Sequence, residues 1–288
     1  MSRKMDIIRI GEIDYTNVWP ILYHFPKKEY ENQIQFVSEV PTKLNHALSN
    51  GELDMAPISS FAYAESFQEY VLFPDLSVSS FGKVNSILLF HKKPIEEIAN
   101  LRIALTTASA TSVNLLKIII HKFYGGNPQY FYAEPNLENM LKKADAALLI
   151  GDDAIQAKWM NSKYEVTDLG ELWTDLTNSW MTFAVWAVRK DIVKEKPKLV
   201  QQIFRLLQES KERGLKDRKK MLSEAQARIG GSKSFWEKYF SELSHDFGQF
   251  QKNGLKLYYQ YARDMKLISE QVPIQMWTNR ESPEIIKY

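Results

Sequence analysis

Residues 101–126 read LRIALTTASATSVNLLKIIIHKFYGG, and this segment indicates the fold class. Leu101–Leu105 is a short apolar run typical of a buried strand, and Ser112–Tyr124 repeats apolar residues at helical spacing. Gly125 and Gly126 end the helix, because glycine readily takes the left-handed conformation that follows helices. A strand that leads directly into a helix is the repeating unit of α/β proteins.

The same alternation extends over the first two-thirds of the chain. Strands are expected at 7–13, 35–40, 53–58, 86–90, 128–132, 146–150 and 183–188, and helices at 42–50, 59–64, 137–144 and 154–160. Beyond Pro197 the strand signal fades, and amphipathic helical patterns cover 199–207, 217–228, 234–243 and 255–265. We therefore expect an α/β fold with mainly parallel sheets and a helical C-terminal third.

Two points divide the chain into two lobes. Predicted strands end near His91–Pro94 and near Ala187–Lys190, where the chain can cross from one lobe to the other. This division assigns 1–92 plus 189–288 to a discontinuous first lobe and 93–188 to the second. A ligand then usually lies in the cleft between the lobes, where strands end and helices begin.

The composition excludes several classes of function. The chain has 288 residues, no cysteine, five histidines, and 37 Lys+Arg against 35 Asp+Glu, which gives a net charge of +2. Without cysteine there is no thiol nucleophile, disulfide or Cys-ligated metal, and the histidines lack metal-ligand spacing. The nearly neutral charge argues against a nucleic-acid partner. Apolar runs are far shorter than the ~18 residues that a membrane helix needs, so no membrane partner is expected.

The beginning of the chain, Met1–Ile13, places Arg3 and Lys4 before an apolar run. Asp6 and Arg9 interrupt that run, and no small-residue cleavage site follows, which argues against a signal peptide. We interpret this segment as the first strand of a cytoplasmic protein.

Hydroxyl side chains are concentrated where the strand 101–105 leads into its helix. They belong to Thr106, Thr107, Ser109, Thr111 and Ser112. Free N–H groups and the dipole at a helix N-terminus favour an anion, and hydroxyls add donors without adding charge. Helix capping alone would need only one of the five. We therefore expect Thr107, Ser109, Thr111 and Ser112 to bind a carboxylate or phosphate.

Three further positions lie at the ends of predicted strands. Asp152 or Asp153 can cap a helix after the strand 146–150, and Gly151 permits a close approach of backbone. A magnesium site is the alternative, but no third oxygen ligand is evident. Asn17 is either a turn residue or a neutral amide that points into the cleft. Ser86 has no neighbouring His or Asp, which favours a hydrogen-bonding serine over a nucleophile.

Taken together, these segments resemble the chorismate dehydratase family of the futalosine route to menaquinone, which is related in fold to type II periplasmic solute-binding proteins. The matching segments are 10–17 with Pro20, 51–61, 82–86, 109–112, 147–154 and 183–186. One departure lies at 177–182, which reads Thr-Asn-Ser-Trp-Met-Thr where the family usually has a Thr-Gly-x-Pro-like turn.

The resemblance implies a lyase that dehydrates chorismate to 3-[(1-carboxyvinyl)oxy]benzoate and needs no metal or other cofactor. It places Asn17 and Ser86 at the reacting carbons as catalytic residues. It adds Ser59, Gly151 and Asp152 to the substrate-binding residues. Because no His, Lys or Glu stands out as a general base, we expect a carboxylate of the substrate to remove the proton.

Two other functions stay open at this point. The sister family that makes 1,4-dihydroxy-6-naphthoate usually carries a Ser-Pro-Cys-Pro-Asn-Asp motif, whereas this chain has Tyr15, Thr16 and Asn17 and no cysteine. A non-catalytic anion-binding or solute-binding protein would share the fold, although this sequence shows no signal peptide or lipobox cysteine.

Overall fold

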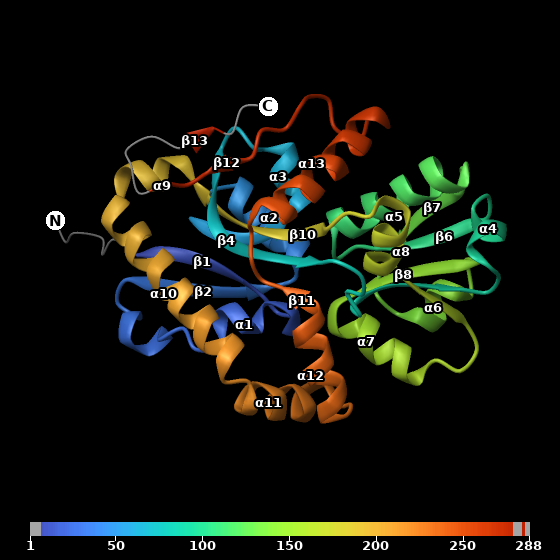
Figure 1. Ribbon diagram of the computed structural model, residues 1–288, viewed down its shortest axis with the longest axis horizontal. Coiled ribbons are helices and arrows are strands. Elements are labelled where there is room, and N and C mark those ends of the chain that lie inside the picture. The colour runs from blue at the N-terminus through green and yellow to red at the C-terminus, as the bar shows by residue number, and fades with distance from the viewer. Residues whose placement is uncertain (1–6, 279–283, 286–288) are drawn as a thin grey trace.

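The computed structural model describes residues 7–278 and 284–285, and their strands form two sheets that lie side by side (Figure 1). The larger sheet contains β1 (Ile8–Ile13), β2 (Ile34–Glu39), β3 (Met55–Ser59), β4 (Tyr70–Ser80), β10 (Met181–Arg189), β11 (Leu243–Ser244), β12 (Gln275–Met276) and β13 (Glu284–Ile285). The smaller sheet contains β5 (Ile87–His91), β6 (Arg102–Thr106), β7 (Gln129–Ala133), β8 (Ala146–Ile150) and β9 (Glu165–Asp168).

Helices cover both sheets and form most of the C-terminal third, as the periodicity predicts. Those before β10 are α1 (Trp19–Leu22), α2 (Pro41–Ser49), α3 (Ser60–Glu65), α4 (Ile95–Ile98), α5 (Ala110–Tyr124), α6 (Leu137–Leu141), α7 (Gly151–Met160) and α8 (Leu169–Thr177), with short 3-10 turns η1 (Thr16–Val18) and η2 (Lys27–Tyr30). Those after β10 are α9 (Lys190–Glu195), α10 (Pro197–Lys216), α11 (Lys219–Ile229), α12 (Lys233–Glu242) and α13 (Gln249–Asp264).

The segment that opened the sequence analysis folds as β6 followed by α5. Ser109 is the N-cap of α5, because its hydroxyl accepts a hydrogen bond from the Ser112 backbone N–H. Gly125 ends the helix in the left-handed conformation at φ 61°, which confirms the predicted stop. The first-strand prediction is confirmed over Ile8–Ile13, while Arg3 and Lys4 lie outside the described residues.

The pairing of strands corrects the predicted lobe boundaries. β5 pairs with β8 and β9 in the smaller sheet, although the division 1–92 assigned it to the first lobe. β10 pairs with β3 and β4 in the larger sheet, although 93–188 assigned it to the second. The chain therefore changes sheet before each of these strands and not after it. Both strands are almost wholly buried, and a continuous apolar run does not reveal which neighbours it will pair with.

Both sheets are mixed, which corrects the expectation of mainly parallel sheets. Parallel pairing joins β1 to β2 and β3, and β6 to β7 and β8. The strands that follow the two changes of sheet, β5 and β10, run antiparallel to both of their neighbours. A strand that enters a sheet from the opposite lobe arrives from its carboxyl edge, so it runs against the parallel strands.

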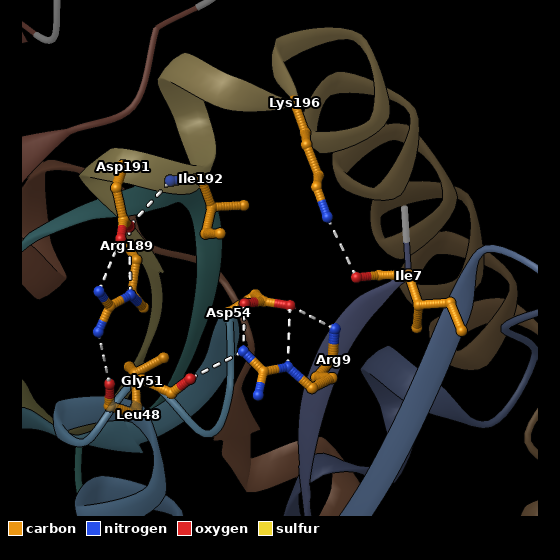
Figure 2. A network of polar contacts seen from close by, with 9 residues as sticks. All are labelled: Ile7, Arg9, Leu48, Gly51, Asp54, Arg189, Asp191, Ile192 and Lys196. Carbon is orange, nitrogen blue, oxygen red and sulfur yellow. Dashed lines mark hydrogen bonds and ion pairs between the residues drawn. The ribbon is translucent and has the colours of Figure 1, made fainter. Parts of the chain in front are cut away.

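A polar network fixes the strand order β10-β3-β1 at the edge where β1 begins (Figure 2). Asp54, just before β3, accepts hydrogen bonds from the backbone N–H and the guanidinium of Arg9 at 2.7 and 2.8 Å. Its own carbonyl accepts from the Arg189 backbone N–H at 3.1 Å. Because this network occupies one edge, the carboxyl ends of β1 and β3 project from the opposite edge, toward the smaller sheet.

Candidate functional site

The candidate site lies where the carboxyl edges of the two sheets meet. β1 and β3 are parallel neighbours, so they end at one edge of the larger sheet, where the chain enters η1 and α3. β6 and β8 end together in the smaller sheet, where the chain enters α5 and α7. Ligands of open α/β sheets bind at such carboxyl edges. Two sets of contacts join these edges, one between η1 and α7 and one between α3 and α5.

The first contact joins Thr16 to Asp152. The Thr16 hydroxyl donates to the Asp152 carboxylate at 2.6 Å, and the Thr16 backbone N–H donates to it at 3.2 Å. Burial raises the pKa of Asp152, while the bonds from Thr16 and the charge of Arg228 oppose that rise. Among the described residues no side chain caps α7, so the capping prediction for Asp152 and Asp153 is wrong. The carboxylate reaches the opposite lobe instead of its own helix.

Gly151 meets the larger sheet at the same place. Its φ is +63°, and a Cβ added there would lie 2.8 Å from the ring of Tyr15. Both the left-handed backbone and the close ring therefore require glycine. The Gly151 backbone N–H also donates to the Ser86 carbonyl at 2.7 Å, which brings Ser86 beside α7.

Asn17 and Ser86 belong to this same buried cluster. Asn17 follows Thr16 in η1, and its buried Oδ1 has no hydrogen-bond partner among residues 7–278 and 284–285. Ser86 is 1% exposed, and its hydroxyl makes a long bond of 3.3 Å to the Val84 carbonyl. A buried polar atom without a partner costs about 1–3 kcal/mol, so such atoms mark places where a ligand supplies the missing bond. Four of the predicted site residues thus converge here.

The second contact gathers the other predicted residues. Ser59 caps α3 by accepting from the Ala62 N–H at 3.2 Å, and Thr111 accepts from the Phe61 N–H at 2.9 Å. Ser109 donates to the Ser112 hydroxyl at 3.0 Å. The N-termini of α3 and α5 therefore face each other, with Ser59, Ser109, Thr111 and Ser112 all buried at this junction. Thr107 differs, since its side chain is exposed in the turn before α5.

The sequence analysis missed Asp168, which shapes the segment that carries Ser86. Its carboxylate accepts from the backbone N–H groups of Val84 at 3.1 Å and Asn85 at 2.6 Å, and it caps α8. Asn85 takes a left-handed φ of 58°, and its amide donates to Glu242 at 2.5 Å. Burial raises the pKa of Asp168, and the backbone donors oppose that rise. The strand-to-helix position of Asp168 was the available signal.

Two side chains from the C-terminal third also reach the site. The His245 Nε2 lies 2.7 Å from the Asn17 carbonyl, and because a carbonyl only accepts, the ring proton is on Nε2. Burial, with the charges of Lys211 and Arg218, lowers the pKa of His245 to about 4, so the ring is neutral near pH 7. Tyr239, on α12, places its buried hydroxyl near Ser86 and Thr16. Neither residue belongs to a motif that could have revealed it.

No group of three or more His, Asp or Glu side chains that could hold a metal ion occurs in the described part of the chain. None of the helices in residues 7–278 is both long enough and apolar enough to cross a membrane.

Comparisons with known proteins agree with this arrangement. Residues 8–264 match a family described as menaquinone biosynthesis. The chorismate dehydratase of Thermus thermophilus is 35% identical over 265 residues, which cover 86% of this chain and 93% of that protein. A crystal structure from Archaeoglobus fulgidus superposes with a TM-score of 0.73 at 18% identity, covering 92% of this chain and all of the other.

The fold has a second kind of relative. The periplasmic aliphatic sulphonate binding protein of Escherichia coli superposes with a TM-score of 0.68 at 15% identity, covering 98% of this chain and 94% of that protein. This confirms the two-lobed, periplasmic-binding-protein-like fold, and at such identity it shows the fold alone. The resemblance recognised in the motifs is confirmed by the match over 8–264 and by the relative at 35% identity. By both measures, the chain belongs to the menaquinone biosynthesis family.

Proposed function

We propose that this protein is a chorismate dehydratase, a lyase that eliminates water from chorismate to give 3-[(1-carboxyvinyl)oxy]benzoate. The observation that carries the proposal is the convergence of Asn17, from the end of β1, with Ser86, from the segment before β5, in one buried polar cluster. The relative at 35% identity bears the same activity in its name. The same resemblance leads us to propose the futalosine route as the pathway and the cytoplasm as the location.

The reaction removes a proton and a hydroxide from neighbouring ring carbons. The proton leaves the carbon that carries the enolpyruvyl ether, and conjugation with the ring carboxylate stabilises the resulting anion. The electron pair of the broken C–H bond then forms the new C=C bond as the C–O bond breaks. Proton and hydroxide together make water, and the aromatic ring that forms supplies the driving force.

The proposed roles follow from where the side chains lie. Ser109, Thr111 and Ser112, with the N-terminus of α5 and with Ser59 opposite, would hold one carboxylate of the substrate. Thr107 is left out of these contacts because its side chain is exposed.

At the other end of the site, Asn17 and Ser86 would face the reacting carbons and hydrogen-bond the hydroxyl or the enolpyruvyl group. Gly151 and Asp152 would close this end and exclude water. Two neighbouring titratable groups are already engaged, since Asp152 accepts from Thr16 and the His245 ring donates to the Asn17 carbonyl. We therefore assign removal of the proton to a carboxylate of the substrate, and the enzyme contributes mainly positioning and electrostatic stabilisation.

Incubation of the purified protein with chorismate tests the proposal. We expect a product lighter than chorismate by one water, with a benzoate-type ultraviolet spectrum that coincides with authentic 3-[(1-carboxyvinyl)oxy]benzoate in chromatography. A protein-free incubation corrects for spontaneous decay of chorismate. Absence of conversion, combined with tight binding of a different anion, would instead support a solute-binding protein.

A further inference from the structure

We propose that Tyr239 is a further substrate-contacting residue, whose hydroxyl donates a hydrogen bond to the ring hydroxyl that leaves. The inference rests on the proposed dehydration and adds to it a residue from the helical C-terminal third. It assigns this part of the chain a direct role in the reaction, beyond covering the sheets.

The ring of Tyr239 is held rigidly. It is 1% exposed and packs edge-on against Trp236, with ring centroids 5.4 Å apart. Phe235 stacks on it at 5.9 Å, and Phe240 lies at 5.3 Å. Such packing leaves one orientation for the phenol, so its hydroxyl points to a fixed place.

That place is the cluster that contains Asn17 and Ser86. The hydroxyls of Ser86 and Thr16 and the carboxylate of Asp152 are all close enough to influence the ionisation of Tyr239. Yet the Tyr239 hydroxyl has no hydrogen bond of good geometry within the part of the chain that the structure describes. Proteins rarely bury a hydroxyl in this way, because it loses its bonds to water without replacement. The arrangement is that of a donor waiting for a partner that the chain does not supply.

Helix α12 reaches this position by bridging the two lobes. Phe235 packs edge-on against Trp159 of α7 at 5.0 Å, and the Ile229 carbonyl accepts from Gln156 of α7 at 3.2 Å. In Figure 1, α12 lies below the two sheets and beside α7. Tyr239 is therefore positioned by both lobes and meets the substrate where they come together.

The leaving hydroxyl has the hydrogen-bonding pattern that this cluster requires. Its hydrogen can be donated to the buried Oδ1 of Asn17, and its oxygen can accept from Tyr239. Burial raises the pKa of Tyr239, with the charges of Asp152 and Asp168 adding to the rise, so the phenol keeps its proton. When the C–O bond breaks, the electron pair leaves with oxygen and the Tyr239 hydrogen bond stabilises the growing negative charge. The hydroxide then combines with the proton taken from the ring carbon.

The test is Tyr239→Phe, which keeps the aromatic packing and removes only the hydroxyl. We expect kcat for chorismate to fall about 100-fold, the loss typical of one transition-state donor. The melting temperature should stay equal or rise, because no bond within the protein is lost. Inhibition by 3-[(1-carboxyvinyl)oxy]benzoate should be unchanged, because the product has no ring hydroxyl for Tyr239 to hold.

Tyr63→Phe is the matched control. The buried Tyr63 hydroxyl donates to the Pro273 carbonyl and accepts from the Gln275 N–H at 2.9 Å in each case, so its removal should lower the melting temperature and leave kcat unchanged. Turnover of Tyr239→Phe within threefold of the parent would overturn the inference, and so would failure of that variant to fold. A loss of product affinity equal to the loss of kcat would overturn the assignment to the leaving hydroxyl. If the parent protein itself does not convert chorismate, the proposed function fails independently of Tyr239.

Discussion

The side chain of Thr16 donates a 2.6 Å hydrogen bond to Asp152, 136 positions later in the chain. Thr16 follows β1 of the larger sheet, and Asp152 lies in the first turn of α7 after β8 of the smaller sheet. This one contact therefore fastens the two carboxyl edges together, next to the buried amide of Asn17.

Asparagine in place of Asp152 should weaken this fastening. Both Thr16 groups donate, and an amide nitrogen would meet one of them with a second donor. We expect Asp152→Asn to lose about 1–3 kcal/mol of unfolding free energy and to reduce turnover. Urea unfolding measures the first and an initial-rate assay the second. Asp153→Asn removes the same charge without touching Thr16, and an equal loss in both variants would show that the contact is not responsible.

Removal of either proposed catalytic side chain should affect the reaction and not the fold. Asn17→Ala and Ser86→Ala should each reduce kcat for chorismate about 100-fold or more, as expected for groups that act on the reacting atoms. Their melting temperatures should match the parent. The exposed Asn50→Ala and Ser241→Ala serve as controls. A variant that retains near-normal turnover would remove its residue from the site.

Asp168 should influence both stability and turnover, because it holds the segment that precedes Ser86. Asp168→Ala leaves the N–H groups of Val84, Asn85, Gly170 and Glu171 without their acceptor. We expect a loss of about 3 kcal/mol in unfolding free energy, with a fall in kcat from displacement of Ser86. Asp168→Asn keeps one acceptor oxygen and should lie between parent and alanine variant. Full stability of the alanine variant would contradict this role.

His245 should make the fold sensitive to acid. Its pKa is lowered to about 4 by burial and by Lys211 and Arg218, against about 6.5 in an unfolded chain. Between these values the unfolded state binds more protons, so stability falls as the pH drops from about 6.5 toward about 4. We expect this group to contribute about 2 kcal/mol of the loss between pH 7 and pH 4.5.

Urea unfolding of His245→Gln at both pH values measures this contribution. Gln can still donate to the Asn17 carbonyl and does not titrate, so its loss of stability in acid should be smaller than that of the parent. Identical acid sensitivity in the two proteins would show that His245 is already protonated at pH 7 or remains neutral in acid. Asp246, which faces the same group, stays in place in both.

Local signals were sufficient where neighbours in the sequence determine the structure. Ser109 is recognisable as a helix cap from the residues beside it, and Gly125 as a stop. The strand β4 escaped prediction because Pro74 and Asp75, which has a φ of 54°, interrupt its apolar pattern and its pairing with β10 is irregular.

The remaining features depend on partners far away in the sequence. Asp152 was expected at the site, but its position suggested a cap, and its actual partner Thr16 can be identified only from the folded chain. Tyr239 and His245 look like ordinary residues of an amphipathic C-terminal region. Only their burial and the bonds they make, or leave open, distinguish them.

The pairing of Ser80 with Met181 has a consequence for how the protein is assembled. These residues are neighbours at the ends of two adjacent antiparallel strands, so the whole smaller sheet is an insertion into what would otherwise be a hairpin. During synthesis β4 must wait until that insertion has been made before its partner β10 emerges, which favours early folding of the inserted part and late closure of the larger sheet. A short turn from Ser80 to Met181 would in principle restore the uninterrupted hairpin, which suggests how a simpler ancestor could have gained its second half.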